Sequence, residues 1–167
     1  MNKSITNSIR FVFFILLQLY LLDNFLFLDY INPYVYIIFI LLLPISMSSI
    51  QVMLLSFLLG LTLDVFHNSG GVHAAACLVL GYFRPLALRN AFGVNFDFQT
   101  LKFYGEGFKP LLVYVSIMVG IHHLVMFSME AFSLAYIPRI LTNTLYSGIF
   151  SIALIILVIY FLKPSKK

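Results

Sequence analysis

The sequence contains no tryptophan, a single cysteine and few charges, since Asp, Glu, Lys and Arg make up only 10% of its 167 residues. Cys77 has no cysteine partner within the chain, which excludes an internal disulfide framework and a cysteine-based metal site. A soluble domain is about a quarter charged and roughly half apolar. Hydrophobic residues reach 62% here, more than a domain of this size can hide from water, so we expect a membrane protein.

The cations are concentrated in three stretches of the chain. They precede the first apolar run, separate the fourth run from the fifth, and follow the last run: Lys3, Arg10, Arg84, Arg89, Lys102, Lys109, Lys163, Lys166 and Lys167. Arg139 alone lies elsewhere. Cations beside membrane segments remain in the cytoplasm, so the pattern predicts that both termini are cytoplasmic. The net charge of +4 then belongs to the cytoplasmic fringe of a membrane protein, which anionic lipid could contact, and does not indicate nucleic-acid binding.

The apolar runs predict an all-α fold: a polytopic membrane protein whose whole chain forms one bundle of six transmembrane helices. The expected helices cover about 9–27, 33–45, 50–66, 72–88, 110–132 and 138–162. The second is short, and Pro44 should end or kink it. Because no small-residue cleavage site follows the first run, we interpret that run as a retained helix. The connection over 89–109 fits either a segment lying on the membrane surface or a loop packed over the helix ends.

Polar and small residues inside the apolar runs are the candidate functional residues, because hydrocarbon penalises polar groups. The third run has three such residues spaced four apart, which places them on one helix face: Ser56, Gly60 and Asp64. Gly60 would let another helix approach closely. Asp64 and His73 flank one short outer turn, so we expect the two side chains to meet.

The fourth run combines a stripe for close packing with two polar residues. Gly71 and Gly81 belong to a mostly small-residue stripe. His73 and Arg84 share a face roughly 16 Å apart along the axis, and Pro85 should loosen the last turn.

The last two runs hold the remaining candidate residues. His123 and Glu130 are seven residues apart and share a face, whereas His122 should point elsewhere. Glu130 and Arg139 flank the outer turn between the fifth and sixth runs, and a pair between them would explain why an outward cation is tolerated.

Three chemical interpretations compete with a structural role. Asp64, His67 and His73 are ordinary zinc ligands, but their spacing matches no strong motif. An intramembrane aspartyl protease needs a second carboxylate, which no other mid-membrane Asp supplies. A proton path could use His122 and His123. We favour a role in joining helices or in binding a partner, with no metal, no cofactor and no catalysis.

Two blocks of the sequence resemble a known family. The first consists of Gly60-Leu61-Thr62-Leu63-Asp64-Val65-Phe66, Gly71-Val72-His73-Ala74-Ala75-Ala76 and Arg84-Pro85. The second consists of His122-His123, Phe127, Glu130, Phe132-Ser133, Arg139 and Ser147. Together they resemble the rod shape-determining protein MreD family, particularly its Bacteroidetes-type members, over about half of the chain.

The resemblance implies a non-enzymatic protein of the bacterial cytoplasmic membrane that maintains cell shape. The partner of this family is MreC, a single-span protein, and the complex works with the glycan polymerase and transpeptidase of lateral peptidoglycan synthesis and, indirectly, with the MreB filament. The family is similar in fold to the substrate-binding membrane subunits of vitamin transporters, which supplies the alternative function. A scaffold should present a groove for a partner helix, whereas a vitamin-binding subunit should enclose an outer pocket.

Overall fold

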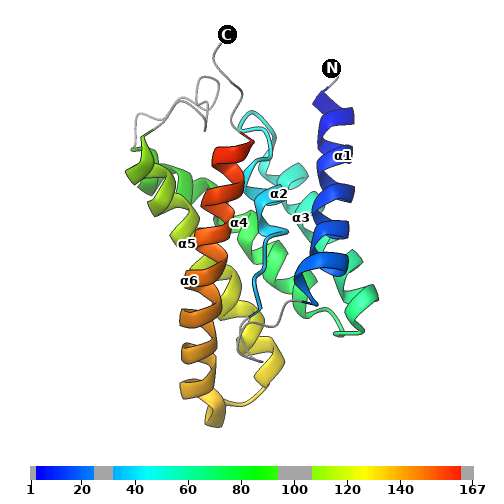
Figure 1. Ribbon diagram of the computed structural model, residues 1–167, viewed down its shortest axis with the longest axis vertical. Coiled ribbons are helices and arrows are strands. Elements are labelled where there is room, and N and C mark those ends of the chain that lie inside the picture. The colour runs from blue at the N-terminus through cyan, green and yellow to red at the C-terminus, as the bar shows by residue number, and fades with distance from the viewer. Residues whose placement is uncertain (1–2, 25–31, 94–106, 163–167) are drawn as a thin grey trace.

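The computed structural model describes residues 3–24, 32–93 and 107–162. The elements are α1 (Lys3–Leu16), the π-helical turn η1 (Leu17–Leu22), α2 (Ile37–Leu41), α3 (Ser49–His67), α4 (Val72–Phe92), α5 (Phe108–Ala131), the 3-10 turn η2 (Leu134–Tyr136) and α6 (Ile137–Phe161). The described ranges contain no strand, which confirms the all-α fold. The beginning of α1 and the end of α6 lie at the same end of the bundle (Figure 1).

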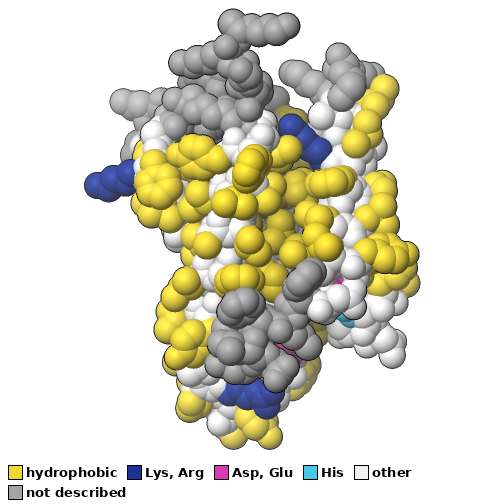
Figure 2. All heavy atoms as spheres, viewed as in Figure 1, with side chains coloured by type: hydrophobic (Ala, Val, Ile, Leu, Met, Phe, Trp, Pro, Cys, Tyr) yellow, Lys and Arg dark blue, Asp and Glu magenta, His cyan; other side chains and the backbone are white. Residues whose placement is uncertain are grey.

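Four helices of the described part are long and apolar enough to cross a membrane: Ile5–Leu22, Ser49–His67, Phe108–Ala131 and Ile137–Phe161. Figure 2 shows a broad belt of hydrophobic side chains, with basic side chains near the two ends of this face. α4 is 21 residues long but carries Arg84 and Arg89, and it is not one of the four. In the described residues the structure thus supports a membrane protein with four candidate spans by length and composition, and the six spans that the sequence predicts stay a prediction.

The second apolar run departs most from the prediction. In place of a helix over 33–45, only Ile37–Leu41 is helical, and residues 32–34 have no regular structure. All residues from 33 to 43 are buried, and α2 contacts α1, α3, α4 and α5. Figure 1 shows this segment running through the middle of the bundle. Non-helical backbone at membrane depth is tolerated only where protein covers it, which explains the complete burial.

Two side chains take over the hydrogen bonds that a continuous helix would have made. The fully buried Gln18 accepts from the backbone N–H of Val35 (2.9 Å) and donates from Nε2 to the carbonyl of Pro33 (3.0 Å). The backbone N–H of Tyr34 donates to Ser151 Oγ on α6 (3.0 Å). Gln18 lies in the π-helical turn η1. The extended segment is therefore held between the end of the first helix and α6.

The remaining helix limits differ from the predicted ones by a few residues. α3 begins after a capping box in which Ser48 and Gln51 exchange hydrogen bonds, and it ends at Asn68, whose φ is +52°. α4 continues to Phe92, beyond the predicted end at 88, and Pro85 lies inside it without ending it. The interpretations of the connection over 89–109 fall mostly on residues 94–106, which lie outside the described residues.

Candidate functional site

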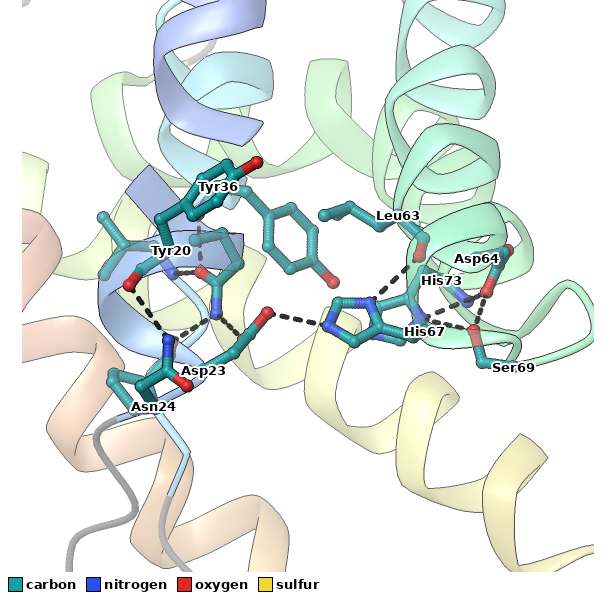
Figure 3. Close-up of polar contacts among 12 residues, drawn as sticks. Tyr20, Asp23, Asn24, Tyr36, Leu63, Asp64, His67, Ser69 and His73 are labelled. Atoms are coloured by element: carbon teal, nitrogen blue, oxygen red, sulfur yellow. Dashed lines mark hydrogen bonds and ion pairs between the residues drawn. The ribbon is translucent and has the colours of Figure 1, made fainter. Parts of the chain in front are cut away.

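Asp64, near the end of α3, supplies the cap that the first turn of α4 lacks. The N-cap residue Gly71 has no side chain to offer, and the first N–H groups of a helix have no partner within it. Asp64 accepts from the backbone N–H of His73 (2.9 Å) and of Ala74 (2.8 Å), while Ser69 Oγ donates to the same carboxylate (Figure 3). A carboxylate also complements the positive end of the helix dipole.

The expected contact between Asp64 and His73 is present. His73 Nδ1 lies 3.0 Å from Asp64 Oδ1, and both residues are buried. Their helices also approach closely at Gly60, where a Cβ atom would lie 2.3 Å from the carbonyl oxygen of His73 and 2.6 Å from the Cα of Ala74. Only glycine fits at this position.

The two other glycines of the predicted packing face differ from each other. At Gly81 a Cβ would lie 2.9 Å from Ser56 Oγ and 3.2 Å from the Cα of Met53, so this glycine does allow close packing. Gly71 does not, since nothing lies within 4 Å of its Cβ position. Its φ of +99° identifies it as a turn residue, because a positive φ favours glycine. The stripe prediction was therefore wrong for Gly71.

His67 joins the end of the first helix to α3. Its Nε2 lies 2.7 Å from Asp23 Oδ2 and its Nδ1 lies 3.0 Å from the carbonyl oxygen of Leu63 (Figure 3). Both partners accept when Asp23 is ionised, and only a doubly protonated imidazole can donate to both. This arrangement therefore fits an imidazolium paired with a carboxylate.

The three side chains considered as zinc ligands, those of Asp64, His67 and His73, do not point to a common centre. The ring of His67 stacks on that of His73, with centroids 5.0 Å apart, and it directs Nε2 to Asp23 and not to Asp64. In the part of the chain that the structure describes, no group of three His, Cys, Asp or Glu residues could hold a metal ion. The geometry gives the zinc interpretation no support.

A second polar group lies in the middle of the bundle and comes from three separate segments. His123 Nδ1 lies 2.9 Å from the carbonyl oxygen of Val119, and His123 Nε2 lies 3.2 Å from Ser151 Oγ. A carbonyl only accepts, so Nδ1 carries the proton and Ser151 donates to Nε2. Ser151 in turn accepts from the N–H of Tyr34. These bonds link α5, α6 and the extended segment.

His122 is also fully buried, although the sequence predicts that it points away from the face of His123. Its Nε2 lies 2.8 Å from Tyr36 Oη. The buried segment before α2 explains why two adjacent histidines both face protein, since it adds a second neighbour to α5. His122 Nδ1 has no hydrogen-bond partner, and the same holds for the buried Ser56 Oγ. A proton path, one of the alternatives to a structural role, would need a partner at that nitrogen.

Arg84 lies about two turns before the end of α4, where it binds the carbonyl end of α2. It is only 3% exposed. A terminal nitrogen of its guanidinium donates to the carbonyl of Leu43, and its Nε donates to Tyr114 Oη (3.3 Å). Tyr114 Oη in turn donates to the carbonyl of Leu41 (3.4 Å). Arg84 and Tyr114 thus satisfy carbonyls that the short α2 leaves without helical partners, while Asp64 caps the opposite end of α4.

Glu130 and Arg139 line one cavity of about 350 Å³ together with Asn143 and Tyr136. Both charged residues are exposed. The ion pairs found among the described residues join His67 to Asp23 and His73 to Asp64, so the expected pair between Glu130 and Arg139 is not formed. Glu130 lies at the end of α5, past the protein-covered stretch that holds His123.

Sequence reasoning missed Gln18, Ser151, Tyr34, Tyr36 and Tyr114, which connect the buried segment to its surroundings. Gln18 could have been singled out as a neutral polar residue inside the first apolar run, by the same argument that singled out Asp64. The tyrosines gave no comparable signal, because interfacial anchoring is their usual role in a membrane protein.

Comparison with known proteins gives no further identification. No protein-family model, no curated protein and no solved structure matches the chain.

Proposed function

We propose that this chain is a non-enzymatic membrane scaffold of the MreD kind, which binds MreC in the lateral peptidoglycan synthesis complex and helps maintain rod shape. In this proposal the chain lies in the bacterial cytoplasmic membrane with both termini cytoplasmic. Its partners are MreC, the glycan polymerase and transpeptidase of elongation, the MreB filament indirectly, and the lipid bilayer. The sequence resemblance is the origin of the proposal.

One observation supports a scaffold in particular: the residues that carry the resemblance hold helices together. Gly60 and Asp64 join α3 to the start of α4. Arg84 joins the end of α4 to the buried segment. Because their polar atoms are engaged in these contacts, such residues suit the maintenance of a fixed surface better than the turnover of a substrate.

A groove along α5 and α6 suits a transmembrane helix of the partner. It is lined by Phe108, Ala153, Leu157, Tyr160 and Phe161. Helices associate in a membrane through close packing at small residues, and Ala153 is an exposed small residue of this lining. A single-span partner such as MreC would place one helix here.

Co-purification tests this placement. Ala153→Phe should reduce the amount of MreC that co-purifies from membranes, because the added ring occupies the groove. Leu58→Phe, an exposed position on α3, is the control and should leave co-purification unchanged. Both variants should melt like the wild type, since both side chains are exposed on the surface of the chain. Undiminished co-purification of Ala153→Phe would reject the groove, and the absence of any MreC with the wild type would reject the scaffold.

The alternative is a substrate-binding subunit of a vitamin transporter. The cavity beside Glu130, Arg139 and Asn143 favours it, because a small ligand site is concave with a few polar groups. Depletion of the protein separates the two functions. A scaffold predicts that rod-shaped cells become round while division continues. A transporter subunit predicts unchanged width and growth that depends on an added vitamin.

A further inference from the structure

Arg84 is a buried cation without a buried anion. In the described part of the chain the ion pairs involve only His67 and His73, and the partners of Arg84 are the carbonyl of Leu43 and the hydroxyl of Tyr114. A buried charge is costly unless it is paired. The carbonyl end of a helix carries at most about half a negative charge, so it offsets the guanidinium only in part.

Arg84 lines a cavity of about 360 Å³ that is open to the surface. The polar part of its lining consists of Arg84 and three serines, of which Ser46 and Ser48 lie in the turn between α2 and α3 and Ser49 is the first residue of α3. The apolar part includes Val52 and Leu88. No carboxylate belongs to the described lining. The turn between α2 and α3 lies at the end of the bundle where α1 begins and α6 ends (Figure 1).

These groups together match a phosphate. Arginine is the side chain that most often binds phosphate oxygens by several charge-assisted hydrogen bonds. Serine hydroxyls donate to the same oxygens. The cavity also borders the first turn of α3, which begins after Ser48, and helix N-termini favour anions. The apolar side of the lining can cover the first carbons of an acyl chain, which free phosphate would leave without a partner.

We propose that this cavity binds the phosphate group of an anionic membrane lipid. The bound phosphate completes the charge balance of Arg84 and thereby stabilises the contact between α4 and the buried segment. The site is independent of any partner protein, so it stands whether or not the chain is a scaffold.

The test measures the melting temperature of the purified full chain in neutral detergent. Phosphatidylglycerol should raise it in a saturable manner. A galactosyl diacylglycerol with the same acyl chains should not, because it lacks the phosphate. Inorganic phosphate should have a much smaller effect. An equal effect of inorganic phosphate would assign the site to free phosphate instead, and an equal effect of the glycolipid would overturn the proposal.

Ser46→Asp provides the matched variant. Ser46 is exposed, and a carboxylate there would occupy the place of the phosphate and repel it, so the affinity for phosphatidylglycerol should fall about tenfold or more. Ser133→Asp adds the same charge at an exposed position of the opposite end and should retain the lipid effect. Equal lipid effects in the two variants would overturn the proposal. Ser49→Asp replaces Ser46→Asp if the latter fails to fold.

Discussion

Asp64 Oδ1 accepts two hydrogen bonds from His73, one from the backbone N–H at 2.9 Å and one from ring Nδ1 at 3.0 Å. One carboxylate therefore fixes the beginning of α4 and the orientation of a ring that belongs to it. The same ring stacks on His67, which pairs with Asp23. The end of the first helix, α3 and α4 are thus connected through adjacent side chains.

Asp64→Ala should destabilise the bundle by about 2–6 kcal/mol, because it leaves the buried N–H groups of His73 and Ala74 without acceptors, and each such group costs about 1–3 kcal/mol. The measurement is unfolding of the purified protein in detergent. Asp64→Asn retains one acceptor oxygen and should lie between Asp64→Ala and the wild type. Thr62→Ala, an exposed position of the same helix, is the control. A wild-type melting curve for Asp64→Ala would show that the cap is dispensable.

Gly60→Ala and Gly120→Ala should differ sharply although the substitution is the same. At Gly60 the new methyl group would collide with the backbone of His73, and at Gly120 nothing lies within 4 Å. We expect Gly60→Ala to prevent accumulation of folded protein. In contrast, Gly120→Ala should be neutral or raise stability by up to about 1 kcal/mol, since alanine is the better helix former. Comparable expression and melting of the two variants would contradict the close approach of α3 and α4.

The contact between Asp64 and His73 could be predicted from the sequence because it is local. Both residues flank one short turn, so helical spacing alone brings them together. The close helix approach at Gly60 could be predicted as well, because Gly60 is a small residue on the same helix face as Asp64. The partner of Arg84 could not be predicted, because the carbonyls that Arg84 and its neighbour Tyr114 bind belong to a segment that begins its contact with Arg84 at Leu43, 41 residues earlier in the chain. Their availability depends on the early end of α2.

The buried segment itself could not be predicted for a physical reason. Residues 33–43 are apolar enough for a short helix, and Pro33 suits the first turn of one. What keeps Tyr34 and Val35 out of a helix is the supply of hydrogen bonds from Gln18 and Ser151. A single polar residue in an apolar run indicates that a partner exists, but it does not say which backbone group that partner is.

Ser56→Ala and Ser151→Ala should have opposite outcomes. Ser56 Oγ is buried without a hydrogen-bond partner, so its removal should be neutral or stabilising. Ser151 accepts from the N–H of Tyr34 and donates to His123. Its removal should cost about 1–3 kcal/mol for the unpaired N–H, plus the lost bond to the ring. Unfolding in detergent measures both effects. Equal stability of the two variants would argue against the pairing of the extended segment with α6.

Thiol labelling tests the orientation that the cations predict. Cys77 is buried, and Cys77→Ala provides a background without reactive thiols. Ser133→Cys lies in the exposed turn between α5 and α6, and Lys109→Cys lies at the exposed start of α5, near the opposite end. Because cations beside membrane segments resist translocation, an impermeant maleimide added to intact cells should label Ser133→Cys only. Lys109→Cys should be labelled once the membrane is permeabilised, which also controls for its reactivity. Labelling of Lys109→Cys alone in intact cells would invert the orientation, and the lipid site of Arg84 would then face the outer leaflet.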